Sequence, residues 1–197
     1  MSRLLHFISH PNVVIDPAVP VPRWSLSEIG KARMIEGLKQ PWISEVVSIY
    51  SSTEQKAIDT ARILAGHLSI NFKQEEDLGE NDRSSTGFLK PDEFEAVADE
   101  FFANPERSVR GWERATDAQR RIVRAVTSIE QQDPSVGSIA IVSHGAVGTL
   151  LFCYLTGKPI SCEWDQPPNG GGNFYTFTLA PIHAIAGWAA IDRSAAL

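Results

Sequence analysis

The sequence is poor in cysteine and contains no long uninterrupted apolar segment. Its two cysteines, Cys153 and Cys162, do not form a C-x-x-C pattern, which argues against a redox motif, and Cys153 lies in an apolar helical stretch where we expect a buried free thiol. No window approaches the roughly 18–20 consecutive apolar residues of a membrane span. The first residues also lack a basic segment followed by an apolar run, so we expect no signal peptide. These absences predict a reduced, cytoplasmic protein without a membrane partner.

Basic residues are also scarce. Lysine and arginine number 18 against 24 acidic residues, which gives a formal net charge of −6. No basic stripe is visible, so we expect no nucleic-acid partner. Apolar residues make up 43% and charged residues 21%, which is ordinary for a globular domain, and 197 residues fit a single domain over 1–197. An anionic substrate would need a locally positive pocket inside this acidic chain.

The strongest positive feature is a short apolar run near the start that ends in a polar pair. Residues 4–8 read Leu-Leu-His-Phe-Ile and are followed by Ser9, His10 and Pro11. A compact apolar run without polar alternation is typical of a strand buried on both faces of a parallel sheet. Pro11 cannot donate to the sheet, so the strand should end at His10. The same arrangement returns at 139–145, where a second apolar run ends in Ser143 and His144.

The rest of the chain alternates strand and helix patterns. Apolar spacing and capping residues predict further strands at 46–51, 70–73, 138–142, 174–179 and 184–191, and helices at 25–40, 52–68, 91–102, 116–131 and 146–155. This alternation predicts an α/β fold, a three-layer α/β/α sandwich with a mostly parallel central sheet. The polar segment 75–116 interrupts the pattern, and we interpret it as a cap or insertion over the active site.

The two histidines are expected to meet. Ligands bind outside the carboxyl ends of strands in open parallel sheets, and both His10 and His144 are predicted there. A neutral imidazole can act as a nucleophile near neutral pH. Gly145 and Ala146 lie at the start of the helix that follows His144, where free N–H groups favour an anion. This edge of the sheet is therefore the predicted functional site.

These residues resemble the motifs of the histidine phosphatase superfamily, which has the phosphoglycerate mutase-like fold. The family's first strand ends in Arg-His-Gly, and here 9–11 read Ser-His-Pro. A later strand ends in Ser-Ser and continues as Arg-Ala-x-x-Thr-Ala, which 51–61 match with Lys56 in place of the arginine. A Leu-x-Glu segment matches 78–80, and Ser-His-Gly matches 143–145.

The resemblance implies a role for each matched residue. His10 is the nucleophile that becomes phosphorylated, Glu80 is the proton donor with Asp82 as the fallback, and His144 and Lys56 hold the phosphoryl oxygens. Gly145 belongs to the same phosphate-binding set, and no metal or organic cofactor is needed. A metal site built from His10, His144 and a carboxylate lacks a supporting H-x-x-x-H or Cys/His cluster.

The departures from the family pattern weaken the expected phosphate site. Ser9 replaces a guanidinium and contributes at most a hydroxyl, and an ammonium at Lys56 cannot bind phosphate bidentately. Losing one charge-assisted contact costs about 1.5–3 kcal/mol, or roughly one to two decades in rate. We expect Arg23, on the proline-rich loop, to act as a substitute, and Arg83 is another candidate.

Taken together, the resemblance implies a phosphomonoester hydrolase that acts through a phosphohistidine on a small phosphorylated molecule. Inorganic phosphate is the other expected ligand. The alternative is a catalytically weakened or inactive family member that serves as an anion-binding or protein-interaction domain. Mutase activity is disfavoured because the longer insertions of dedicated mutases are missing. A homodimer is left open.

Overall fold

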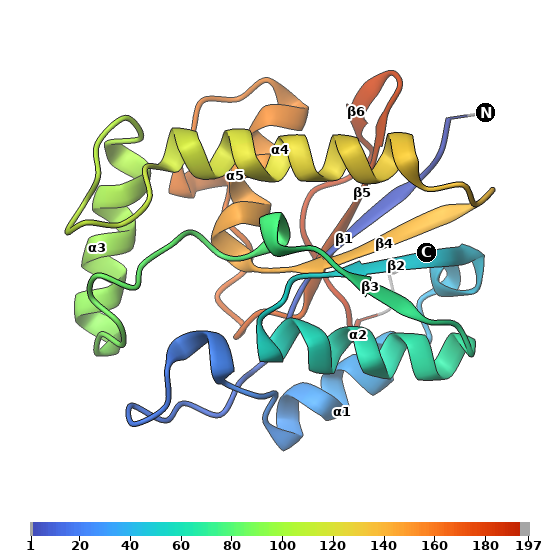
Figure 1. Ribbon diagram of the computed structural model, residues 1–197, viewed down its shortest axis with the longest axis horizontal. Coiled ribbons are helices and arrows are strands. Elements are labelled where there is room, and N and C mark those ends of the chain that lie inside the picture. Colours follow the sequence, from blue (N-terminus) through green and yellow to red (C-terminus); the bar gives the residue numbers. More distant parts are fainter. Residues whose placement is uncertain (1, 194–197) are drawn as a thin grey trace.

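The computed structural model describes residues 2–193, and its core is one seven-stranded sheet with helices on both faces (Figure 1). The strands are β1 (Leu5–Ser9), β2 (Val46–Ser51), β3 (Phe72–Gln74), β4 (Ser138–Ser143), β5 (Asn173–Leu179), β6 (Ile182–Ala184) and β7 (Ala189–Ala190). The α-helices are α1 (Glu28–Gly37), α2 (Gln55–Leu68), α3 (Pro91–Ala103), α4 (Ala115–Gln132) and α5 (Gly145–Thr156). Short 3-10 helices are η1 (Val21–Arg23), η2 (Pro41–Glu45), η3 (Glu76–Leu78) and η4 (Cys162–Trp164).

The sheet is mixed, with its parallel part at the centre. The strand order is β3-β2-β4-β1-β5-β6, and β7 pairs with β5. The four strands from β3 to β1 run parallel, and β5 joins β1 antiparallel. The predicted three-layer α/β fold with a mostly parallel sheet is therefore confirmed. The single late strand predicted at 184–191 is wrong, because β6 and β7 are separate short strands that both pair with β5.

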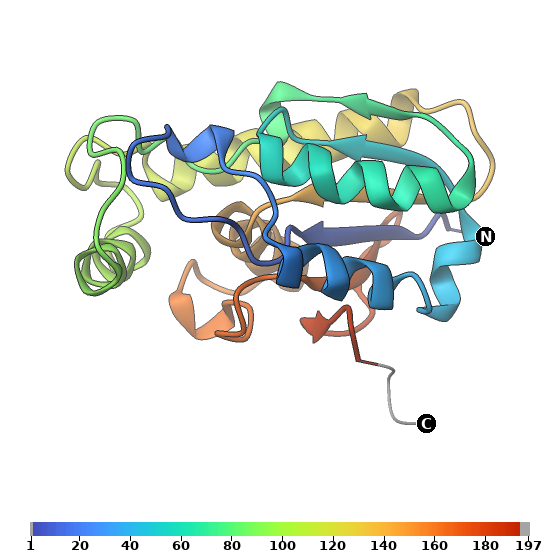
Figure 2. The same cartoon turned by 90° about the horizontal axis from the view of Figure 1, so that it is seen from below.

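The central strands are apolar throughout because each face of the sheet is covered. Leu5 and Phe7 of β1 pack in one core with residues of α4 and α5, whereas Ile8 packs in a second core with residues of α1 and α2. Figure 1 shows α4 along one side of the sheet and α1 and α2 along the other, and Figure 2 looks from the side of α1 and α2. His6 is buried in this sandwich, stacked on Trp42 at a centroid distance of 4.2 Å, and is a core residue.

The register of the two central strands places their ends side by side. In the parallel pair of β1 and β4, Leu5 lies opposite Ile139 and Ser9 lies opposite Ser143. The residues that follow, His10 and His144, therefore leave the sheet at the same edge. The backbone N–H of His10 still donates to the carbonyl of Ser143 at 3.0 Å, which holds the two strand ends together.

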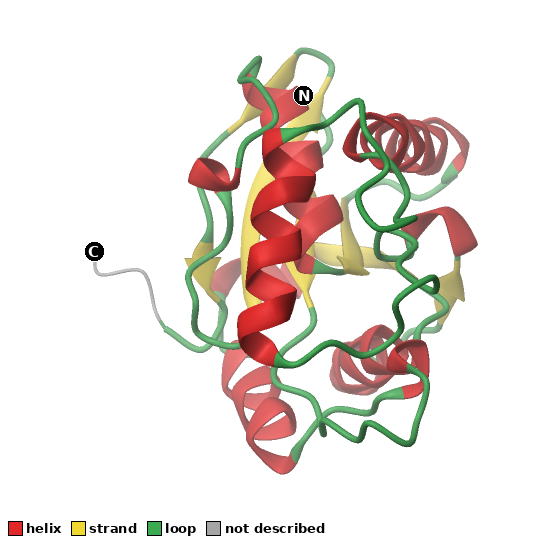
Figure 3. Ribbon diagram, turned by 90° about the vertical axis from the view of Figure 1, so that its left-hand side faces the viewer, coloured by secondary structure: helices red, strands yellow, loops and turns green. Residues whose placement is uncertain are grey.

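The segment 75–116 lies beyond this edge. It contains η3 and α3, and α3 stands nearest the viewer in Figure 3, in front of the end of the sheet. Phe101 and Trp112 pack into the core formed with α4 and α5, so the segment is anchored rather than loose. Among residues 2–193, no helix is both long and apolar enough to cross a membrane.

Candidate active site

The two strand-end histidines lie in contact. The ring centroids of His10 and His144 are 5.2 Å apart and the ring planes meet at 69°. The two side chains are therefore direct neighbours at the ends of adjacent strands. The neighbouring strand β2 adds Ser52, whose backbone N–H donates to Val142 at 2.9 Å. Three parallel strands thus deliver polar side chains to one edge, as expected for a ligand site in such a sheet.

The two ring nitrogens of His10 have different surroundings. Its Nδ1 lies 2.9 Å from the carbonyl oxygen of Pro11, a pure acceptor, so Nδ1 carries the proton and Nε2 keeps its lone pair. Burial, with the charge of Lys56 nearby, lowers the pKa of His10 to about 4. The imidazole is therefore neutral at physiological pH. It lines a cavity of about 450 Å³, called here the catalytic cavity, together with Glu80, Asn81 and Arg83.

His144 is held differently. It is fully buried, and its Nε2 is 2.8 Å from the hydroxyl of Ser52 and 3.4 Å from a carboxylate oxygen of Glu54. Burial is the main cause that holds the pKa of His144 well below its usual value, although the charge of Glu54 opposes it. Its Nδ1 has no hydrogen-bond partner among residues 2–193. Nδ1 is buried, and with Nε2 accepting from the Ser52 hydroxyl it carries the proton of the neutral ring.

Glu80 shares the catalytic cavity with His10. Its carboxylate accepts backbone hydrogen bonds from Asn81, Val147 and Ala146 at 3.1, 3.1 and 3.3 Å. Burial raises the pKa of Glu80 above its usual value, which favours the protonated form that a proton donor needs. The expectation that the N–H groups at the start of α5 receive a substrate anion needs correction, because the side chain of Glu80 already takes those of Ala146 and Val147.

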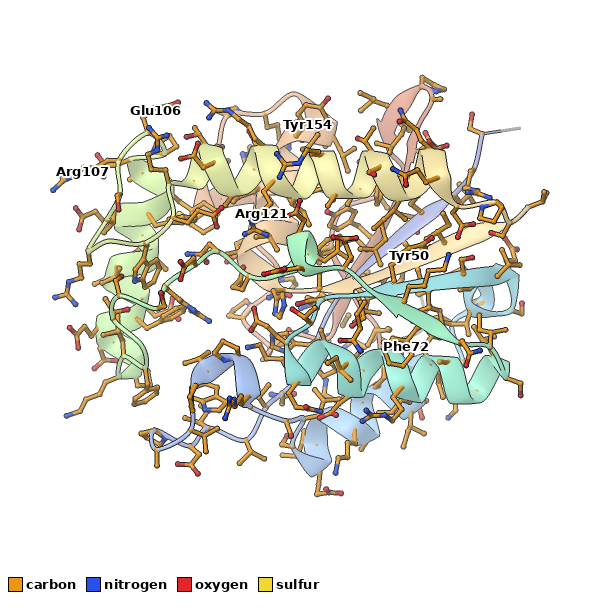
Figure 4. All side chains as sticks on the ribbon, viewed as in Figure 1. Tyr50, Phe72, Glu106, Arg107, Arg121 and Tyr154 are labelled. Atoms are coloured by element: carbon orange, nitrogen blue, oxygen red, sulfur yellow. The ribbon has the colours of Figure 1, made fainter. Side chains whose placement is uncertain are left out.

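Arg121 fixes the loop that carries Glu80. Its guanidinium donates to the carbonyls of Asp77, Gly79 and Glu80 at 2.8–3.1 Å, and pairs with Glu113 at 2.8 Å. Figure 4 shows Arg121 reaching from α4 toward this loop. Arg121 therefore contacts this loop and is not simply a solvated residue of α4. Its position beside the buried Ala118, Ile122 and Ala125 on α4 was the available signal.

Ser9 does not face the cavity. It is fully buried, donates to Oε1 of Gln166 at 2.6 Å and accepts from the backbone N–H of Asn173 at 3.0 Å. Gln166 itself lines the catalytic cavity beside His10 and Gly145. A Cβ on Gly145 would lie 2.3 Å from Nε2 of Gln166, so the glycine makes room for this amide. Gln166 is 156 residues from His10 along the chain, and no motif in the sequence indicated it.

Lys56 is brought to the site but is already paired. Its ammonium lies 2.5 Å from a carboxylate oxygen of Glu54 and 3.1 Å from the carbonyl of Val21, and the side chain is buried. Burial opposes ionisation of Glu54, but the charge and the hydrogen bond of Lys56 lower the pKa of Glu54 to about 2, so Glu54 is ionised and offsets the ammonium. Sequence reasoning missed Glu54, which is placed between the two predicted phosphate ligands.

Of the two candidate arginines, the structure brings Arg83 into the site. Arg83 lines the catalytic cavity, and its guanidinium carbon lies 4.8 Å from the centre of the Phe94 ring. No carboxylate pairs with Arg83 within the described residues. Arg23 is exposed at the end of η1 and does not line that cavity.

Asn81 and Asp82 follow Glu80 in the chain and differ in their surroundings. Asn81 is buried, lines the catalytic cavity, and its Nδ2 has no hydrogen-bond partner in the described part of the chain. The fallback donor Asp82 is exposed, and hydrogen bonds from Ser84 lower the pKa of Asp82, so it stays ionised and is a poor proton donor. Across residues 2–193, no cluster of His, Cys, Asp and Glu has the arrangement of a metal site.

Solved structures share this fold. A mycobacterial glucosyl-3-phosphoglycerate phosphatase bound to inorganic phosphate superposes with a TM-score of 0.80 at 17% identity, covering 98% of this chain and all of that one. Bacillus stearothermophilus YhfR gives 0.77 at 22% identity, with 98% of both chains covered. An Entamoeba histolytica phosphoserine phosphatase in complex with 3-phosphoglyceric acid gives 0.74 at 17% identity, covering 95% of this chain and 97% of that one.

The chain matches a protein-family model but no individual curated protein. A family model matches residues 25–175, a range that contains Lys56, Glu80 and His144 and begins after His10. That boundary agrees with the altered Ser-His-Pro motif at the first strand end. On this match, which spans most of the sequence, the chain belongs to the histidine phosphatase superfamily (branch 1).

Proposed function

We propose that the protein is a phosphomonoester hydrolase in which His10 carries the phosphoryl group. The observation that supports this most is the pair of neutral imidazoles at 5.2 Å, with Nδ1 of His10 tied to the carbonyl of Pro11. Membership of the histidine phosphatase superfamily and the phosphatase fold of the structural neighbours agree with a phosphatase. A small phosphorylated molecule is the proposed substrate.

In the first half of the reaction, Nε2 of His10 attacks phosphorus and a nitrogen–phosphorus bond forms. The ester bond between phosphorus and the alcohol oxygen breaks, and the protonated carboxyl of Glu80 gives its proton to that oxygen. The alcohol leaves. Arg83 and the amide of Asn81 bind the phosphoryl oxygens, and Nδ1–H of His144, whose Nε2 accepts from the Ser52 hydroxyl, donates to another oxygen. These groups stabilise the charge that develops in the transition state.

In the second half, water attacks the phosphohistidine. Glu80, now a carboxylate, accepts a proton from the water as its oxygen bonds to phosphorus, and the bond to His10 breaks. Inorganic phosphate leaves, and both His10 and Glu80 return to their starting states. The lowered pKa of His10 keeps the nucleophile unprotonated, and the raised pKa of Glu80 favours the protonated carboxyl that the first step needs.

A second candidate function follows from the pairing of Lys56 with Glu54 and from the replacement of an arginine by Ser9. With two cations of the family pattern lost or offset, the site is suited to a member that binds an anion without turnover. The same residues would then hold phosphate, and the carboxylate of Glu80 would cap the N-terminus of α5.

An assay of 4-nitrophenyl phosphate hydrolysis between pH 5 and 8 separates the two functions. The hydrolase proposal predicts turnover that disappears in His10→Ala and persists in the control His67→Ala, an exposed histidine. Phosphate binding in calorimetry with no hydrolysis by the unmodified protein would support the binding domain instead. Turnover that survives His10→Ala would contradict both.

A further inference from the structure

An apolar cavity of about 240 Å³ lies beside the catalytic cavity. It is formed between the proline-rich loop and the segment after Arg83, and its apolar walls are Ile15, Val21, Trp24, Phe88, Leu89 and Phe94. The rings of Trp24 and Phe88 are 5.8 Å apart, so two distant segments of the chain meet across it. An apolar cavity of about 150 Å³ is enough to hold benzene. This one has room for a phenyl group and a short linker.

Arg83 joins the apolar cavity to the catalytic one. Its side chain lines both, and so do Phe94, Glu95 and Ile15. The Arg83 guanidinium lies against the Phe94 ring, which places a cation at the border between the reacting groups and the apolar walls. A substrate whose phosphate contacts Arg83 therefore projects the rest of its structure toward the aromatic side chains.

The charges around both cavities oppose a second anionic group. A third cavity of about 700 Å³ adjoins them and shares Arg83. Acidic residues line the three cavities at Glu54, Glu76, Glu80, Asp82, Glu95 and Asp165. Arg83 is the one lysine or arginine among the lining residues of these three cavities. In the proposed reaction it binds the phosphate that is transferred, so it is not available to a second anionic group. A carboxylate or second phosphate on the leaving group would meet like charge without a partner.

We propose that the preferred substrates are phosphomonoesters of apolar, aromatic alcohols without a second anionic group, with the leaving group bound between Trp24, Phe88 and Phe94. The inference rests on the proposed hydrolase function. It also separates this chain from its structural neighbours, since one of them is described as a glucosyl-3-phosphoglycerate phosphatase and another was solved with 3-phosphoglyceric acid.

The test compares kcat/KM for three alkyl esters: 2-phenylethyl phosphate, ethyl phosphate and 3-phosphoglycerate. All three leaving groups are aliphatic alcohols, so differences report binding rather than intrinsic reactivity. We expect 2-phenylethyl phosphate to exceed ethyl phosphate by about 10- to 100-fold, and 3-phosphoglycerate to be the poorest of the three. Turnover with 3-phosphoglycerate equal to or above that with 2-phenylethyl phosphate would overturn the inference and leave the hydrolase proposal standing.

Substitutions in the apolar cavity test whether it binds the leaving group. Phe88→Ser should lower kcat/KM for 2-phenylethyl phosphate by about tenfold and leave ethyl phosphate unaffected. The matched control is Val136→Ser, since Val136 is 97% exposed and lines none of these cavities. Equal losses for both esters in Phe88→Ser would contradict a leaving-group site.

A charge change gives a second readout that does not depend on folding of the aromatic loop. Glu95 is exposed on α3 and borders both cavities. Glu95→Lys should raise kcat/KM for 3-phosphoglycerate relative to 2-phenylethyl phosphate by about tenfold. An unchanged ratio would show that charge does not set the preference. Absence of hydrolysis with every ester, 4-nitrophenyl phosphate included, overturns the proposed function and the inference with it.

Discussion

The chain carries two strand ends with the same Ser-His sequence, and the structure gives them different surroundings. At the first, Pro11 ends the strand in a loop, His10 is half-buried, and its Nδ1 bonds to a backbone carbonyl. At the second, Gly145 begins α5, and His144 is fully buried against Ser52 and Glu54. Within residues 2–193, Nε2 of His10 has no hydrogen-bond partner and its ring lines a cavity, whereas Nε2 of His144 is occupied.

The serines differ as much as the histidines. Ser9 is tied to Gln166 and Asn173, while Ser143 donates to the carbonyl of Leu78 at 2.7 Å and so supports the loop of Glu80. Identical dipeptides in register therefore have different surroundings: one histidine lines a cavity, and the other is fully buried. A loop that contains Pro11, Pro17, Pro20 and Pro22 follows the first histidine, and α5 follows the second.

We expect the largest effect when each of the two histidines is replaced by alanine, because this tests directly whether they have different roles. In 4-nitrophenyl phosphate hydrolysis, His10→Ala should lower kcat by at least about 10⁴-fold, because the nucleophile is lost. His144→Ala should cost about 10²–10³-fold, because it removes one stabilising contact. A larger loss for His144→Ala would reverse the assigned roles.

The pH profile comes next. His10 must be deprotonated to attack, so kcat/KM should rise as pH passes through about 4, the pKa of His10. Glu80 must be protonated to donate, so kcat/KM should fall above the raised pKa of Glu80. Glu80→Gln should lose the falling limb and about 10²–10⁴-fold in kcat with 2-phenylethyl phosphate. Asp82→Asn is the control, and a falling limb that persists in Glu80→Gln would assign it to another group.

The two serines provide a third test. Ser9→Arg alone should lower the melting temperature, because the buried hydroxyl is bonded to Gln166 and the amide fills the adjoining space. Combining it with Gln166→Gly should let the guanidinium reach the cavity and raise kcat/KM by about 10- to 100-fold. Ser143→Arg is the matched control and should gain nothing from Gln166→Gly. A gain with Ser9→Arg alone would show that Gln166 yields readily.

The smallest effect concerns the ion pair beside His144. Glu54→Gln should free the ammonium of Lys56 while keeping an acceptor for the backbone N–H of Glu80, which donates to Glu54 at 2.9 Å. Inhibition by inorganic phosphate should then strengthen by about tenfold, the free energy of one charge-assisted contact. Glu28→Gln, an exposed position, is the control. Weaker inhibition would mean that Lys56 does not bind phosphate.

Local patterns in the sequence predict most of the fold. The apolar runs of β1, β2 and β4 and the periodic spacing of α4 predict their elements to within one or two residues. Packing of helices on both faces explains why those runs lack polar alternation. The division of the late segment into β6 and β7 was not predicted, because strands of two or three residues are too short to show a period in the sequence.

The site is less predictable, because its contacts are long-range. Glu54 and Asn81 lie beside motif residues, yet nothing local says that one would pair with Lys56 and the other would line the cavity. Gln166 and Arg121 reach the site from distant segments. A charged side chain on an amphipathic helix is usually solvated, and only the fold shows that Arg121 holds a loop instead.

The most direct measurement is to trap the phosphoryl group during turnover. The enzyme is mixed with 4-nitrophenyl phosphate, whose leaving group needs no proton from residue 80, then quenched in alkali and digested for mass spectrometry of the acid-labile adduct. We expect phosphorylation of His10 and of no other histidine, with a stronger signal in Glu80→Gln because the attack of water on the phosphohistidine is slowed. Phosphorylation at His144, or steady turnover with no adduct in either protein, would contradict it.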